Sequence, residues 1–253
     1  AGAIVDLAYK NNKNPKIAVE VLIGHNECNV IIETNVGIMK IDIVNILERI
    51  TGSNKIKLNL KIVSQDEKLA KNQSERIKCG DNGIFKGVPL NNLEKQISKL
   101  ARKLYDNIPY DGKYILTEDQ LIVCQSNATN EKIQNIINEV IDTKNLKIII
   151  NPLGEWEGGT NVDTGVTNRK LGSDMAQSVT GGGIHGKDLS KADVSINIYA
   201  FKKAQETGKE VELFCAIGDD IIDGKPYNEI VDEAREYINN IGGFEKFAEW
   251  GLY

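Results

Sequence analysis

The sequence is poor in the residues and runs that mark several large classes of protein. None of its apolar runs approaches the roughly 20 residues needed to cross a bilayer, and its start lacks the basic-then-apolar order of a secretory signal. Two histidines and four cysteines without a CxxC pair leave few ligands for structural zinc. We therefore expect a cytoplasmic protein without a membrane partner, whose cysteines are buried free thiols.

Charge and length narrow the possibilities further. The net charge of -5 argues against broad non-specific nucleic-acid binding, although clustered Lys and Arg can still build a local anion site. With 253 residues, 41% hydrophobic and 26% charged, the composition is that of a globular protein large enough for one to three structural units.

Hydrophobic periodicity predicts an α/β protein of the α+β type, in which helices cover one face of each sheet. Paired strands followed by a helix recur about three times, which predicts three similar units in a pseudo-threefold arrangement, with approximate bounds 1–85, 86–157 and 158–253 and some exchange of segments. Residues 64–83 are polar and predict a long mobile loop. Helices are expected at 1–12, 40–51, 90–105, 131–143, 189–206 and 228–240. Strands are expected at 16–23, 29–34, 55–63, near 114–125, 146–151 and 210–217, with a short tail at the end.

The stretch most informative about chemistry is rich in glycine and in charge of both signs. It reads GGTNVDTGVTNRK at 158–170 and GGGIHGKDLSKADVS at 181–195. Glycines allow close approach of the backbone to a ligand, Lys and Arg neutralise phosphate oxygens, and carboxylates hold a hard cation. Lys187 and Lys191 are four residues apart, where a helix would place them on one face. The pattern favours a polyphosphate–Mg²⁺ site; a solvated charged loop with a helix start at Ser190 explains the same residues. It is not a P-loop, because GxxxxGK[ST] does not occur.

Both stretches resemble signature blocks of the S-adenosylmethionine synthetase (methionine adenosyltransferase) family. The first resembles Gly-Gly, a short spacer, Asp, any residue, Gly, Leu or Val, Thr, Gly, Arg, Lys. The second resembles Gly-Gly-Gly-Ala-Phe-Ser-Gly-Lys-Asp, then any residue, Ser or Thr, and Lys-Val-Asp-Arg-Ser. Shorter matches extend the resemblance over essentially the whole chain: 18–20 for Ala-Cys-Glu, 80–83 for Gly-Asp-Gln-Gly, 111–113 for Asp-Ala-Lys and 248–251 for Ala-Ala-Tyr-Gly.

The resemblance implies an enzyme that joins ATP to L-methionine. The methionine sulfur attacks C5′ of ATP, and the tripolyphosphate that leaves is hydrolysed to phosphate and diphosphate. The thioether needs no base, whereas the departing polyanion needs strong stabilisation. The resemblance further implies Mg²⁺ and K⁺ as cofactors and a homo-oligomer, a dimer or tetramer, with active sites shared between subunits.

By the same resemblance, each candidate residue receives a role. The polyphosphate, and with it the chemistry, would be held by Lys113, Arg169, Lys170, Lys187 and Lys191. Asp111 and Asp163 would bind the nucleoside part of ATP, and Trp156 would stack on adenine unless it is a core aromatic. The methionine end would fall to Glu33, Gln65 and Asp81. Asp193 would bind Mg²⁺, and Glu20 would belong to the K⁺ site.

The sequence also departs from the family pattern. The family's Ser-Glu-Gly-His-Pro-Asp-Lys motif, expected just before Ala1, is absent; either the chain begins late or the protein is a natural short form. Phe-Ser of the second block has become Ile184-His185, so His185 is either a phosphate contact or a tolerated loop residue. Two other classes of protein therefore stay open: a non-catalytic or partner-dependent homologue that binds ATP or S-adenosylmethionine, and a different ATP-dependent transferase on the same scaffold.

Overall fold

The computed structural model describes residues 1–72, 76–162, 164–166, 179–180 and 186–252. They form two compact units: unit 1 holds residues 1–89 and the described residues from 164 onward, and unit 2 holds residues 90–162. Within the described residues, no helix is long and apolar enough to cross a membrane.

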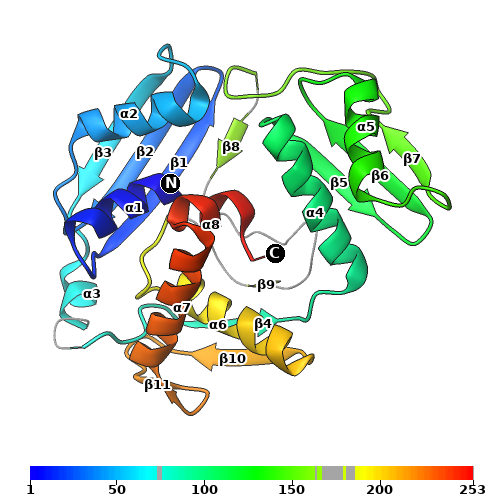
Figure 1. Cartoon of the computed structure of the whole chain (residues 1–253). Helices are drawn as coiled ribbons and strands as arrows, with labels where there is room; N and C mark the ends of the chain where they lie inside the picture. Colours follow the sequence, from blue (N-terminus) through cyan, green and yellow to red (C-terminus); the bar gives the residue numbers. More distant parts are fainter. Residues whose placement is uncertain (73–75, 163, 167–178, 181–185, 253) are drawn as a thin grey trace. The chain divides into compact units, whose positions relative to one another are not determined.

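The first sheet of unit 1 has the strand order β3-β2-β1-β8. Strands β1 and β2 form an antiparallel hairpin, β3 runs parallel to β2 after helix α2, and β8 adds antiparallel to β1. His25 and Asn26 close the hairpin at positive φ, a conformation that Asn and His adopt more readily than most residues. Helices α1 and α2 lie on one face of the sheet (Figure 1). The elements are α1 (Gly2–Asn11), β1 (Ile17–Gly24), β2 (Glu27–Thr34), α2 (Lys40–Thr51), β3 (Lys57–Val63) and β8 (Thr164–Val166).

The second sheet of unit 1 has the order β10-β4-β9, so it joins strands from three distant parts of the chain. Helix α6 packs on β4 and β10, and α7 packs on α6. The approach is so close that a Cβ on Gly87 would overlap the carbonyl oxygen of Ala200. The elements are α3 (Glu67–Asn72), β4 (Gly83–Gly87), β9 (Val179–Thr180), α6 (Ala192–Thr207), β10 (Val211–Cys215), the short pair β11 (Ile221–Ile222) and β12 (Lys225–Pro226), α7 (Tyr227–Ile241) and α8 (Phe244–Trp250).

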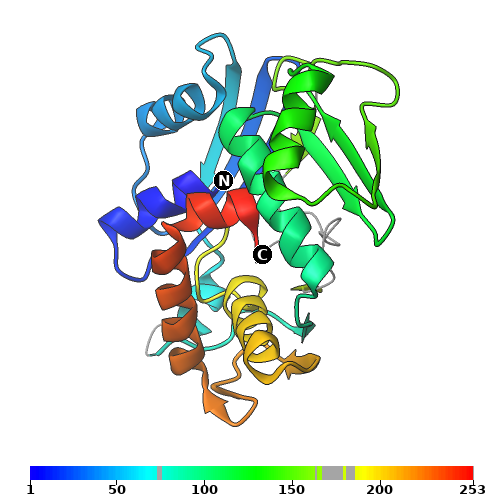
Figure 2. The same ribbon diagram turned by 45° about the vertical axis from the view of Figure 1, so that its right-hand side comes forward.

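Unit 2 is a small two-layer domain. Its sheet has the order β5-β6-β7, antiparallel then parallel, and α4 and α5 pack on it and on each other (Figure 2). Burial alternates along β6, and the buried faces of both helices are Leu- and Ile-rich. Asn91 and Glu94 form a capping box that starts α4. The elements are α4 (Asn92–Asn107), β5 (Gly112–Leu116), β6 (Gln120–Gln125), α5 (Asn130–Val140) and β7 (Lys147–Ile150).

The same order of elements occurs twice, as helix, hairpin, helix and parallel strand: α1-β1-β2-α2-β3 and α4-β5-β6-α5-β7. The mixed α/β class is confirmed; the pseudo-threefold arrangement and its three bounds stay predictions. Two local expectations are corrected. The expected loop 64–83 contains helix α3, and the expected tail contains helix α8, whose Phe244 and Phe247 are buried.

Candidate functional site

Three residues from separate parts of the sequence lie in one row across the first sheet of unit 1. Ala18 on β1 pairs with Glu33 on β2 and, on its other side, with Lys187. Backbone hydrogen bonds from Val19 to Gly186 (2.6 Å) and from Asp188 to Ile17 (3.1 Å) hold the Lys187 segment against β1. Because opposed residues point to the same face of a sheet, Glu33 and Lys187 share a face.

That face is the one turned away from the buried core of the sheet. Ile17, Val19 and Ile32 are buried on the core side, whereas Glu20 and Glu33 are exposed. Glu20 follows Ala18 by two residues and therefore also lies on the exposed face. The structure thus gathers Glu20, Glu33 and Lys187, which the sequence places far apart, on one face of one sheet.

The second signature block meets the 80–83 loop at the start of α6. Lys187 forms an ion pair with Asp193 in the first turn of α6, and the backbone N–H of Asp193 donates to Oδ2 of Asp81 at 3.5 Å. Burial, and then repulsion from Asp193, raise the pKa of Asp81, while the nearby Lys187 opposes the rise. The result is a half-buried cluster of two carboxylates and one ammonium group.

The expectation that Lys187 and Lys191 share a helical face is wrong. Helix α6 begins only at Ala192 with Lys191 as its N-cap, and Lys187 lies in the extended segment beside β1. Lys191 is instead buried, with its Nζ 2.6 Å from Oδ2 of Asp188. The expected helix start at Ser190 is therefore two residues early. The two lysines pair with different carboxylates, Lys187 with Asp193 and Lys191 with Asp188.

Asp188 is the centre of a buried network that fixes this segment. Its carboxylate accepts hydrogen bonds from the backbone N–H of Ile17 (2.8 Å) and Ser190 (2.9 Å) as well as from Lys191. Burial alone would raise the pKa of Asp188, but the positive charges of Lys191 and Lys16 hold it below the usual value. The network explains why the residues from 186 to 193 have a defined path next to β1.

Gln65 is placed just after β3 and is 8% exposed. Among the described residues, its Oε1 atom has no hydrogen-bond partner. A buried unpaired acceptor costs free energy unless a donor reaches it, so Gln65 has an unfilled place for an N–H group. Because β2 and β3 are parallel, with Glu33 opposite Val63, Glu33 and Gln65 both lie toward the same end of the sheet.

In unit 2, Asp111 organises the start of the first signature block. Its Oδ2 accepts the backbone N–H of Gly159 at 2.9 Å, and a Cβ on Gly158 would clash with Asp111 and Ser126. The glycine at 158 is thus required by close approach. Lys113 lies exposed on β5, two residues after Asp111.

Trp156 belongs to the same loop. The residue is 38% exposed, and its indole Nε1 donates to Oδ1 of Asn151 at 3.3 Å. Trp156 is therefore not a buried core aromatic, and its role as an adenine platform stays a prediction. Asp163, Arg169, Lys170 and His185 lie outside the described residues.

The resemblance implies two metals, Mg²⁺ and K⁺, which need different sets of oxygen ligands. Within the described part of the chain, no group of three or more His, Cys, Asp or Glu side chains is arranged to hold a metal ion. Mg²⁺ commonly takes only one or two carboxylates and completes its shell with water and substrate phosphates, so Asp193 with Asp81 beside it fits such a site. For K⁺, the family resemblance implies one ligand, the exposed carboxylate of Glu20. That assignment rests on the resemblance alone.

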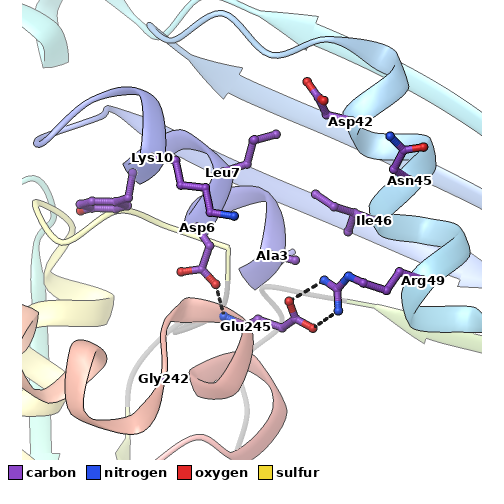
Figure 3. Close-up of a pocket in the computed structure, with 11 residues that line it drawn as sticks. Ala3, Asp6, Leu7, Lys10, Asp42, Asn45, Ile46, Arg49, Gly242 and Glu245 are labelled. Atoms are coloured by element: carbon purple, nitrogen blue, oxygen red, sulfur yellow. Dashed lines mark hydrogen bonds and ion pairs between the residues drawn. The ribbon is translucent and has the colours of Figure 1, made fainter.

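Unit 1 also has two clefts, one apart from these residues and one next to the 80–83 loop. One, of about 620 Å³, is lined by α1, α2 and the start of α8, and the bidentate ion pair of Arg49 with Glu245 (2.8 and 2.7 Å) lies at its edge (Figure 3). Asp6 also lines it and accepts the backbone N–H groups of Phe244 and Glu245, each at 2.8 Å. None of the sequence-predicted site residues lines this cleft. The other, of about 540 Å³, adjoins Asn82 and Cys215.

Sequence reasoning missed the buried partners of the site. No sequence pattern marked Lys16 or Asn197 as functional. Lys16 is 9% exposed. Asn197 is fully buried, and its Oδ1 has no hydrogen-bond partner among the described residues. The one available signal for Asn197 was its spacing, since it lies one helical turn after Asp193 and donates to the carbonyl oxygen of that residue at 2.6 Å.

The fold is similar to that of an S-adenosylmethionine synthetase. A solved structure described as an unusual S-adenosylmethionine synthetase from Campylobacter jejuni superposes with a TM-score of 0.66 over 94% of this chain and 81% of that chain. The two sequences are 18% identical. No protein-family model matches this sequence.

Proposed function

We propose that the protein is a methionine adenosyltransferase, which converts ATP, L-methionine and water to S-adenosylmethionine, phosphate and diphosphate. The observation that carries the proposal is the meeting of two separate sequence blocks in unit 1. Lys187 and Asp193 of the second block contact each other, and Asp193 contacts Asp81 of the 80–83 loop. A fold shared with a synthetase adds support at the level of architecture.

In this proposal Lys187 stabilises the polyphosphate as it leaves. Its ammonium is now held by Asp193, which keeps it oriented and partly desolvated, with 21% of the side chain exposed. A preorganised cation in such a site stabilises the transition state more than it would in water, because the developing negative charge of the phosphates meets a positive charge already in place. Mg²⁺ would neutralise further phosphate charge at Asp193. Lys113, Arg169 and Lys170 complete the proposed set of phosphate cations.

The same proposal assigns Lys191 a positioning role in addition to the phosphate contact that the resemblance implies. Its ammonium is bound to Asp188 and only 6% of its side chain is exposed. The pair anchors the segment that carries Lys187 next to β1.

The methionine end is proposed to lie with Gln65, Glu33 and Asp81. The unpartnered Oε1 of Gln65 suits the ammonium group of an amino acid, which is a donor without acceptor capacity. Exposed Glu33 supplies a carboxylate toward the same end of the sheet. Asp111, Asp163 and Trp156 are assigned to the nucleoside, and Glu20 with K⁺ to charge balance.

Homo-oligomerisation is part of the proposal. The exposed face of the second sheet carries the paired residues Ile84 and Phe214, which are 55% and 63% exposed. Large apolar side chains that face solvent on a flat sheet favour burial against a partner. The partner that we propose is a second copy of this chain.

The test is direct formation of the sulfonium product. Protein, ATP and L-methionine with Mg²⁺ and K⁺ should give S-adenosylmethionine by mass spectrometry, with one phosphate and one diphosphate per product. Lys187→Ala should lower kcat about a hundred- to thousand-fold, the effect of removing one preorganised charge contact. The matched control is Lys209→Ala, which removes an exposed lysine just after α6 and should leave kcat unchanged.

The results separate the alternatives. ATP or S-adenosylmethionine binding measured by calorimetry, with no product formed, would identify a non-catalytic homologue and overturn the proposal. Turnover of ATP with another acceptor, but never with methionine, would identify a different transferase. Equal activity of Lys187→Ala and Lys209→Ala would show that the Lys187 cluster does not act on the substrate.

A further inference from the structure

Two cysteines flank one backbone oxygen beside the candidate site. The thiols of Cys79 and Cys215 both donate to the carbonyl oxygen of Asp81, at 3.2 and 3.4 Å between sulfur and oxygen. The two come from distant parts of the chain: Cys79 precedes the 80–83 loop, and Cys215 is the last residue of β10.

The backbone fixes both cysteines in this place. Cys79 donates its N–H to the carbonyl oxygen of Asp219 and accepts from the N–H of Gly218, each at 2.9 Å. Cys215 lies opposite Gly83 in the β4–β10 pairing. The two sulfurs are thus held close together by hydrogen bonds on both sides of the pair.

The thiols also influence each other. When Cys79 is deprotonated, the Cys215 thiol can turn from the Asp81 carbonyl oxygen and donate to the Cys79 sulfur, which lowers the pKa of Cys79; the same hydrogen bond together with burial raises the pKa of Cys215. A thiol–thiolate pair of this kind loses its first proton more readily than its second, as coupled groups do. The thiolate is the form that reacts with oxidants.

In a protomer whose second sheet is not covered by a second copy, a small oxidant has a route to the pair. Cys79 is fully buried, but Cys215 lines the cleft of about 540 Å³ together with Asn82 and Phe214. The cleft also borders Asp219, whose carboxylate accepts the N–H of Ala216 at 2.8 Å.

We propose that Cys79 and Cys215 form a reversible disulfide when a peroxide enters this cleft, and that the disulfide constrains the loop that carries Asp81. Cys215, which faces the cleft, passes its proton to the Cys79 sulfur and attacks a peroxide oxygen, so an S–O bond forms on Cys215, the O–O bond breaks and hydroxide leaves. The second thiol gives its proton to hydroxide, and its sulfur attacks the first. An S–S bond forms, the S–O bond breaks, and the net result is one disulfide and two waters from two thiols and one peroxide.

The disulfide acts on the loop because both thiol donors leave the Asp81 carbonyl oxygen at once. The covalent link then joins residue 79 to the end of β10, across the loop whose Asp81 carboxylate meets α6. The bridge reduces the freedom of residues 80–83 and alters the approach of Asp81 to Asp193. This inference does not depend on which reaction the site performs.

The test uses the full chain treated with hydrogen peroxide and analysed by mass spectrometry. The intact mass should fall by two hydrogen atoms, a peptide linking Cys79 to Cys215 should appear after digestion, and dithiothreitol should reverse both. Backbone hydrogen exchange at residues 80–83 should slow in the oxidised protein and recover on reduction. Cys79→Ser should yield no linked peptide and should leave a sulfenic acid on Cys215, the sulfur that faces the cleft, where dimedone traps it.

A matched control is Cys124→Ser, which changes a half-buried cysteine of unit 2 and should leave the linked peptide unchanged. Independent oxidation of Cys79 and Cys215 to sulfinic acids, or disulfides formed only between molecules, would overturn the proposed pair. A linked peptide with unchanged exchange at residues 80–83 would overturn the proposed effect on the loop. If the untreated protein has no methionine adenosyltransferase activity, the proposed function is wrong, but the proposed disulfide is unaffected.

Discussion

Replacing Asp188 with asparagine tests whether a buried ion pair, and not surface charge, shapes the candidate site. The substitution keeps the size of the side chain but removes its negative charge. Lys191, with 6% of its side chain exposed, then loses its counter-ion, and Lys16 loses a nearby negative charge. The NH₂ group of the asparagine must also face the backbone N–H of Ile17 or of Ser190. Both groups are donors, so one hydrogen bond is lost.

The expected cost follows from the burial of the pair. Breaking a buried ion pair by removing one partner costs about 3–5 kcal/mol, because the remaining charge stays buried without compensation. A domain is stabilised by about 5–15 kcal/mol in total, so the variant should be only marginally folded. Asp232→Asn is the matched control, since its carboxylate is 73% exposed and 3.9 Å from Arg235, and should change stability by less than about 0.5 kcal/mol.

The assay is urea-induced unfolding followed by circular dichroism. Asp188→Asn should lower the unfolding midpoint strongly. Asp188→Asn combined with Lys191→Met should recover part of the loss, because the second change removes the uncompensated ammonium.

The pH dependence of this effect has a definite sign. The pKa of Asp188 is lower in the folded protein than in the unfolded chain, where it is about 3.9. Its contribution is therefore complete above about pH 5 and is lost as the pH falls toward the folded-state pKa. The stability difference between wild type and Asp188→Asn should be constant at neutral pH and shrink in acid. An Asp188→Asn variant as stable as Asp232→Asn, or a difference that grows in acid, would refute the reasoning.

The remaining predictions concern packing and a buried phenol. Gly87→Ala should destabilise unit 1 by more than about 2 kcal/mol in thermal unfolding, because its Cβ would overlap the carbonyl oxygen of Ala200, whereas Gly37→Ala, with no atom within 4 Å of its Cβ, should not. The pKa of Tyr114 is raised to about 12 by burial and by the charge of Asp111, so stability from its neutral form is present below about pH 10 and lost above it. Ultraviolet titration showing Tyr114 ionised at its ordinary pKa of about 10 would contradict that prediction.

Much of the fold could be predicted because its helices and strands carry strong period signals. Helix α2 begins and ends where the spacing of Ile43 and its neighbours predicts, and α4 follows the run of Ile97, Leu100 and Leu104. Short elements were missed because they carry no such signal. Helices α3 and α8 are six and seven residues long, too short for a period to stand out from the surrounding sequence.

The strand partners could not be predicted from local pattern. Strand β4 pairs with β10 and β9, and β8 pairs with β1, although these segments are far apart in sequence. Such pairing depends on the packing of the whole unit, and period-two alternation carries no information about which strand lies beside which.

In the candidate site too, local pattern predicted some features and not others. The sequence blocks pointed to Lys187, Asp193 and Asp81 as candidate residues. The four-residue spacing also suggested that Lys187 and Lys191 share a helical face, which the structure corrects. The two lysines are four positions apart in the sequence, but residues at that spacing share a face only where the backbone is helical. The Asp188 network holds residues 186–188 extended along β1 and lets α6 begin at Ala192. This turns Lys187 toward Asp193 on the sheet face and buries Lys191. The buried Lys191–Asp188 ion pair therefore positions Lys187, the lysine that we propose acts on a phosphate.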